Sequence, residues 1–71
     1  MKLHGYLMDG SEQYYVASFL ASPQEKREIL AWCVNTFGSP VETVRWTDRV
    51  IWGEVYFNNE SDFNWFMMRW S

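Results

Sequence analysis

The amino-acid sequence predicts an α+β fold in which a small antiparallel sheet carries two helices on one face. The length of 71 residues gives a single domain, residues 1–71, and leaves no room for a second one. Two segments that start with helix-capping residues alternate with segments rich in β-branched and aromatic residues, in the order β-α-β-β-α. This order is typical of a ferredoxin-like domain that lacks its last strand.

The first residues leave two alternatives open. Residues 1–12 either add an extra N-terminal strand, which would bring the sheet to four, or form a loose arm, and propensity alone does not choose between them. The next segment, residues 13–20, is a predicted strand because it is rich in aromatic and β-branched residues. Large apolar side chains alternate onto both of its faces, Tyr15 on one and Val16 on the other, so we expect both faces to be covered.

The first predicted helix begins after Ser22, which suits the N-cap. Pro23 fits the first helical position, and Glu25 completes a capping box with Ser22. Gly38 ends the helix as a left-handed C-cap, and Pro40 prevents its continuation. One stripe of this helix is apolar and predicts a buried face: Ile29, Leu30, Cys33 and Phe37.

The segment after this helix predicts a hairpin. Residues 42–47 and residues 50–58 both show the alternation of a strand, and a turn near residues 48–49 joins them. Gly53 lies inside the second of these strands. A glycine at such a position indicates a bulge or the close approach of another backbone.

The second predicted helix begins close to Asn59, whose side chain can cap it. Glu60 and Asp62 add negative charge at the positive end of the helix dipole. Four apolar residues spaced i, i+3, i+4 and i+7 predict the buried face of this helix: Phe63, Phe66, Met67 and Trp70.

Two large apolar residues of the second helix are not explained by this core face. Trp65 and Met68 point to the opposite side of the helix, and the second face of the predicted sheet carries Trp52 and Tyr56. Trp, Tyr and Met are enriched at the centres of protein interfaces. These four residues are therefore the predicted contact surface.

The composition excludes several classes of protein. The formal net charge is −3, and the 6 Lys and Arg residues are scattered, which disfavours nucleic acid as a partner because phosphate binding needs clustered positive charge. No apolar run is long enough for a membrane span, and the first residues lack the pattern of a signal peptide. The single cysteine agrees with a reducing compartment, so we expect a cytoplasmic protein.

The sequence shows no catalytic signature. It contains no phosphate-binding loop, no nucleophile elbow and no zinc-protease motif, and the sole His4 and sole Cys33 do not make a metal site. We expect Cys33 to act as a small buried apolar residue. Glu54 is better explained as the polar position of a strand, or as the partner of Arg45 across the hairpin, than as half of a catalytic carboxylate pair. We therefore predict no catalytic residue, no metal and no cofactor.

The C-terminal stretch WGEVYFNNESDFNWFMMRW, residues 52–70, has a glycine-acidic strand, a charged turn and an aromatic helix that ends in Arg-Trp. It resembles the C-terminal ends of small uncharacterised proteins encoded by tailed bacteriophages. The resemblance implies a viral protein that acts in the cytoplasm of a bacterial host, and it implies no functional residue.

Three functions remain in competition. The first is a non-enzymatic binding protein that acts through its aromatic surface, as a homodimer or as a small inhibitor of a host protein. The second is a pocket for a small or nucleotide-like ligand at a dimer interface, with or without catalysis. The third is single-stranded nucleic-acid binding. The predicted ligand residues of the second are Tyr14, Arg45, Trp46, Trp52 and Tyr56. We favour the first.

Overall fold

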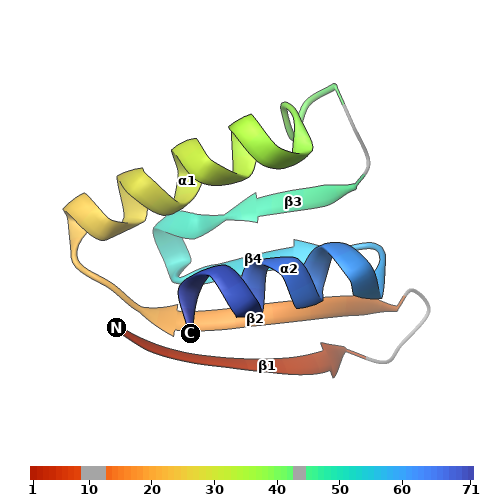
Figure 1. Ribbon diagram of the computed structural model, residues 1–71, viewed down its shortest axis with the longest axis horizontal. Coiled ribbons are helices and arrows are strands. Elements are labelled where there is room, and N and C mark those ends of the chain that lie inside the picture. The colour runs from red at the N-terminus through yellow and green to blue at the C-terminus, as the bar shows by residue number, and fades with distance from the viewer. Residues whose placement is uncertain (9–12, 43–44) are drawn as a thin grey trace.

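The structure, a computed structural model, describes residues 1–8, 13–42 and 45–71. The elements along the chain are β1 (Lys2–Met8), β2 (Tyr14–Leu20), α1 (Pro23–Phe37), β3 (Trp46–Arg49), the 3₁₀ turn η1 (Val50–Trp52), β4 (Glu54–Phe57) and α2 (Glu60–Trp70). The strands form one antiparallel sheet in the order β1-β2-β4-β3 (Figure 1). The α+β class and the predicted order of elements are confirmed, with a strand added at the N-terminus.

Both helices lie on the same face of this sheet (Figure 1). Trp32 of α1 lies 6.0 Å from the Phe66 ring of α2, and Phe66 in turn lies 5.5 Å from Phe57 of the central strand β4, measured between ring centroids. Helix α1 connects β2 to β3, which are not neighbours, because β4 lies between them. The helices and the sheet therefore enclose one aromatic core.

The N-terminal residues form a strand, which decides between the two predicted alternatives. Strand β1 pairs with β2 along its whole length, from Lys2 opposite Leu20 to Met8 opposite Tyr14. The last residues of the predicted segment 1–12 lie outside the described residues.

The predicted hairpin differs from the structure in its second strand. Residues Val50–Trp52 form η1 instead of a strand, and only Glu54–Phe57 pair as β4. The backbone N–H of Val50 donates to the Asp48 carboxylate over 2.9 Å, so a local side-chain bond turns the chain where the sequence pattern suggested extension. Residues 43–44 of the first predicted strand lie outside the described residues.

Gly53 marks the close backbone approach that the sequence predicted. Its φ is +77°, and the N–H of Phe19 donates to its carbonyl oxygen over 2.8 Å. A Cβ at this position would lie 2.6 Å from the Phe19 carbonyl oxygen. Only glycine fits both the conformation and the space.

The helix boundaries follow the predicted caps. Ser22 and Glu25 form the capping box of α1, and the Asn59 side chain accepts the N–H of Asp62 at the start of α2. Gly38 ends α1 with φ 91° and ψ 177°, so its φ is positive as predicted while its ψ lies outside the left-handed helical region. These caps satisfy backbone groups that a helix end leaves unpaired.

The core fills the space between the sheet and the helices. Its buried residues include all but one of the predicted stripe of α1, the centre of the predicted stripe of α2 and the covered positions of the strands: Ala17, Phe19, Ile29, Cys33, Phe37, Trp46, Val50, Val55, Phe57 and Phe66. Both helices cover one face of β2, and neither covers the other face (Figure 1). Val16 on the other face is nevertheless fully buried, flanked by its strand partners Tyr6 and Tyr56.

Candidate functional site

The outer side of α2 presents two large apolar side chains to solvent. Trp65 is 56% exposed and Met68 is 80% exposed, although the opposite side of the same helix is anchored in the core by Phe66. The prediction that these two residues point away from the core is confirmed. They are separated by one turn, so they lie next to each other on the helix surface.

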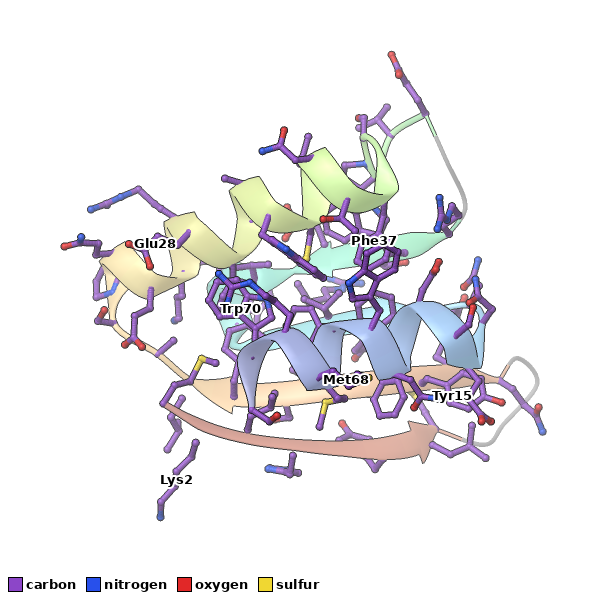
Figure 2. The ribbon with its side chains drawn as sticks, in the orientation of Figure 1. Lys2, Tyr15, Glu28, Phe37, Met68 and Trp70 are labelled. Carbon is purple, nitrogen blue, oxygen red and sulfur yellow. The ribbon has the colours of Figure 1, made fainter. Side chains whose placement is uncertain are left out.

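The ring of Trp65 packs against aromatic rings of α1. Its centroid lies 6.4 Å from Trp32 and 6.2 Å from Phe37, both in edge-to-face geometry. Trp32 also meets Trp70 at 6.1 Å, so rings from both helices pack against one another (Figure 2 labels Phe37 and Trp70). We call the half-buried Trp32 and the exposed Trp65 and Met68 together the helical aromatic surface.

A bidentate ion pair joins the first turn of α2 to the residue that precedes β3. Arg45 donates to both carboxylate oxygens of Asp62, over 3.0 Å and 2.9 Å, and its guanidinium lies 5.4 Å from the centroid of the Phe37 ring. These hydrogen bonds hold the pKa of Asp62 below its usual value, against the effect of burial, and the Asn59 amide lowers that pKa further. Of the two explanations predicted for Glu54, the pairing with Arg45 is therefore wrong, and the polar position in a strand, β4, is confirmed.

The uncovered face of the sheet carries a second group of aromatic side chains. The Tyr6 hydroxyl donates to the Glu54 carboxylate over 3.1 Å, and the rings of Tyr14 and Tyr56 lie 5.7 Å apart. The Arg49 guanidinium lies 6.0 Å from the Tyr56 ring centroid. Partial desolvation raises the pKa of Tyr6, and the negative charge of Glu54 raises it further. These residues come from β1, β2, β3 and β4, and we call them the open-face group.

The structure does not bring the predicted ligand residues together. Only Tyr14 and Tyr56 share a surface. Trp46 is buried on the helix side of the sheet, where its indole N–H donates to the Gly38 carbonyl oxygen over 2.9 Å. Arg45 is engaged with Asp62, as described above, and Trp52 is 72% exposed in η1.

A different hollow lies between α1 and the β3–η1 segment. Its volume is about 320 Å³, and its lining residues are Pro23, Lys26, Arg27, Leu30, Asp48, Val50 and Ile51. Sequence reasoning missed it because it depends on η1, which the strand pattern did not predict. The Lys26 ammonium donates to the Ile51 carbonyl oxygen at this point over 3.1 Å, so part of its polar lining is already paired.

The candidate reactive groups do not form a catalytic centre. Cys33 is fully buried, and burial raises the pKa of its thiol to about 12, so the thiol stays protonated at neutral pH. His4 is exposed on β1 with its ring 6.3 Å from Tyr6. Within residues 1–8, 13–42 and 45–71, no group of three His, Cys, Asp or Glu side chains could hold a metal ion.

Comparison with known proteins identifies no relative. No protein-family model, no curated protein and no solved structure matches the chain. Among the described residues, none of the helices has the length and apolar character needed to cross a membrane.

Proposed function

We propose that this protein is a non-enzymatic binding protein whose helical aromatic surface contacts another protein. The observation that supports it most is the exposure of Trp65 and Met68 on a helix whose other side is anchored in the core by Phe66. The partner is a second copy of the chain or, following the resemblance to bacteriophage proteins, a protein of a bacterial host that this chain inhibits.

The geometry of Trp65 makes this surface suitable for binding. Burying a whole aromatic ring removes roughly 150–250 Å² from water, at about 25 cal/mol per Å², so the exposed half of the Trp65 ring offers about 2–3 kcal/mol to a partner. The edge contacts with Trp32 and Phe37 already restrict the ring. A restricted ring loses less rotamer entropy on binding, which leaves more of this energy as affinity.

The finer fold assignment is also a proposal. We infer that the domain is ferredoxin-like, because β2-α1-β3 with β4 inserted between the two strands is the split βαβ arrangement. In this interpretation β1 takes the place of the last strand of that fold. The assignment concerns the scaffold and carries no activity.

The test replaces both exposed residues and compares masses in solution. Light scattering over a dilution series is measured for the wild type and for Trp65→Ala combined with Met68→Ala. A wild-type dimer that the double variant dissociates shows that the partner at this surface is a second copy. If the double change leaves the mass unchanged, a photo-crosslinking amino acid at position 65 is exposed to bacterial lysate, with the same group at Glu28, which is exposed on α1, as the matched control.

Crosslinks at position 65 that are absent at position 28 would support a host partner. Equal crosslinking at the two positions, together with unchanged masses, would refute the proposal. Thermal unfolding of the double variant is the folding control, since Trp65 contacts Trp32 and Phe37.

A further inference from the structure

The outer edge of the sheet at β1 is a regular strand without a neighbour among the described residues. Strand β1 runs over seven residues, Lys2–Met8, and its only charged residue at neutral pH is Lys2. One edge pairs with β2, and the other faces outward (Figure 1). Edge strands that stay monomeric usually carry charged side chains, prolines or bulges; β1 has Lys2 at its first position, and the rest of the strand has no proline, bulge, Asp, Glu, Lys or Arg.

The backbone groups on this free edge can be assigned by alternation. In antiparallel pairing, the N–H and C=O of one residue point to the same side, and the next residue points to the other side. The N–H of Phe19 donates to Gly53, so the odd-numbered residues of β2 point to β4 and the even-numbered ones to β1. Since Tyr6 lies opposite Val16, the even-numbered residues of β1 face β2.

The odd-numbered residues of β1 therefore direct their backbone groups outward. These residues are Leu3, Gly5 and Leu7, and together they present three N–H groups and three C=O groups on one edge. An antiparallel partner strand must match this spacing.

We propose that two copies of this protein pair through β1, antiparallel and about a two-fold axis at Gly5, so that the two sheets become one continuous sheet. In this register Leu3 lies opposite the partner's Leu7, and Gly5 lies opposite the partner's Gly5. All three outward residues thus meet outward residues, which the hydrogen-bond pattern requires. The interface uses the same strand twice, as a two-fold dimer does.

The side chains of β1 fit this register on both faces. On the helix side, Leu3 meets the partner's Leu7, and in the isolated chain Leu7 is 50% exposed. On the open side, His4 meets the partner's Tyr6. Lys2 meets the partner's Met8, so no like charges lie opposite each other.

The other edge of the sheet, formed by β3, is less suitable for pairing with a second copy. Strand β3 has four residues, and two of them, Asp48 and Arg49, are charged. Asp48 also uses its carboxylate to accept the N–H of Val50. Shortness and charge are the features that keep an edge strand unpaired.

The two α2 helices of such a dimer fit side by side on the joined sheet. Helix α2 contacts β1, β2 and β4, so it stands over β2, and three strand spacings place the two α2 axes about 14 Å apart. Directly packed helices lie roughly 8–10 Å apart, so side chains must fill the remainder. Met67, which lies over Gly5, occupies this side of α2, and methionine adapts to irregular gaps.

This proposal goes beyond the proposed function and does not depend on it. It assigns self-association to β1, whereas Trp65 lies on the side of α2 that faces α1. Trp65→Ala therefore tests the helical aromatic surface without altering the strand pairing.

The first experiment is a change at Leu7. Leu7→Pro removes an outward N–H and no bond to β2, and proline is tolerated on edge strands. Leu7→Val keeps the N–H and an apolar side chain of similar size, so it is the matched control. By sedimentation over a dilution series we expect a wild-type dimer, a similar dimer for Leu7→Val, and a dissociation constant raised about 30-fold or more for Leu7→Pro, because two hydrogen bonds are lost per dimer.

The second experiment uses the wild type alone, so a folding defect in a variant cannot confuse it. Amide hydrogen exchange is measured at low and high protein concentration. We expect the amides of Gly5 and Leu7 to exchange more slowly at high concentration, while those of His4 and Tyr6, which bond to β2, do not depend on concentration. A wild-type monomer at all concentrations, a dimer that Leu7→Pro leaves intact, or concentration-independent exchange at Gly5 and Leu7 would each overturn the proposal.

Discussion

The two faces of the sheet carry similar aromatic side chains in opposite environments. Phe57 and Tyr56 are consecutive in β4, yet Phe57 is fully buried under the helices while Tyr56 is half-buried on the open face. On the covered face, Phe57 meets Phe37 and Phe66 with ring centroids within 5.5 Å. The difference shows that the helices, and not aromatic content, decide which rings contribute to the core.

The open face obtains its order from polar contacts. The Tyr6 hydroxyl donates to Glu54, and the Tyr56 hydroxyl approaches the same carboxylate at 3.5 Å. Bonds between exposed groups stabilise a fold weakly, because water competes for the same donors and acceptors. We therefore expect the covered face to supply most of the stability of the fold and the open face to tolerate change.

The largest effect on stability should come from Phe57, when it is compared with its neighbour Tyr56 in β4. Phe57→Ala removes a buried ring and should lower the free energy of unfolding by about 3–5 kcal/mol, which is enough to unfold much of a domain of this size. Tyr56→Ala should cost about 1 kcal/mol, since its ring is partly solvated. Urea denaturation of both variants measures the contrast. Equal losses of unfolding free energy in the two variants would show that the two faces of the sheet contribute equally to stability.

A smaller effect is expected at Gly5, on the covered side of β1. A Cβ at this position would lie 2.3 Å from the tip of the Phe63 ring and 3.3 Å from the Met67 methyl. Gly5→Ala should therefore lower the free energy of unfolding by about 1–3 kcal/mol, because the Phe63 ring must move out of its place between α2 and β1. His4→Ala, the adjacent change on the open side, is the control and should be within about 0.5 kcal/mol of the wild type. Thermal unfolding of both variants distinguishes them, and an unchanged midpoint for Gly5→Ala would contradict the packing of α2 on β1.

The smallest of the three effects should come from the polar anchor of α2. Asp62→Asn keeps the size of the side chain but weakens the bonds from Arg45, and should cost about 1–2 kcal/mol at neutral pH. The pKa of Asp62 is lowered in the folded protein, so its contribution is complete above the usual value of 3.8 and is lost as the pH falls through the lower folded value. Stability curves of the two proteins should therefore converge in strong acid. A difference that persists there would assign the effect to packing instead of charge.

Local sequence signals predicted much of the fold. Ser22 with Glu25 and Asn59 with Asp62 lie close in sequence, and their caps form in the structure at the predicted helix starts. Helical periodicity separated the buried Phe66 from the exposed Trp65. Such patterns depend on bonds and angles within one or two turns, so they need no knowledge of distant residues.

Other features could not be predicted in this way. Arg45 was expected beside Glu54 and bonds to Asp62, and Trp46 was expected at a ligand site and lies in the core. The chain turns at η1 because Asp48 accepts the N–H of Val50, which competes with an apolar run that favours a strand. Each of these outcomes depends on a contact or a competing bond that alternation does not encode.

The sequence by itself determined the class of fold, the helix boundaries and the outward position of Trp65 and Met68, because capping and periodicity act between near neighbours. Only the tertiary structure decided which face of the sheet the helices cover, that β1 forms its outer edge, and that rings from both helices interlock beneath Trp65. These features bring together residues far apart in the chain. Their arrangement follows from burying the most apolar surface at once, which no single segment can specify.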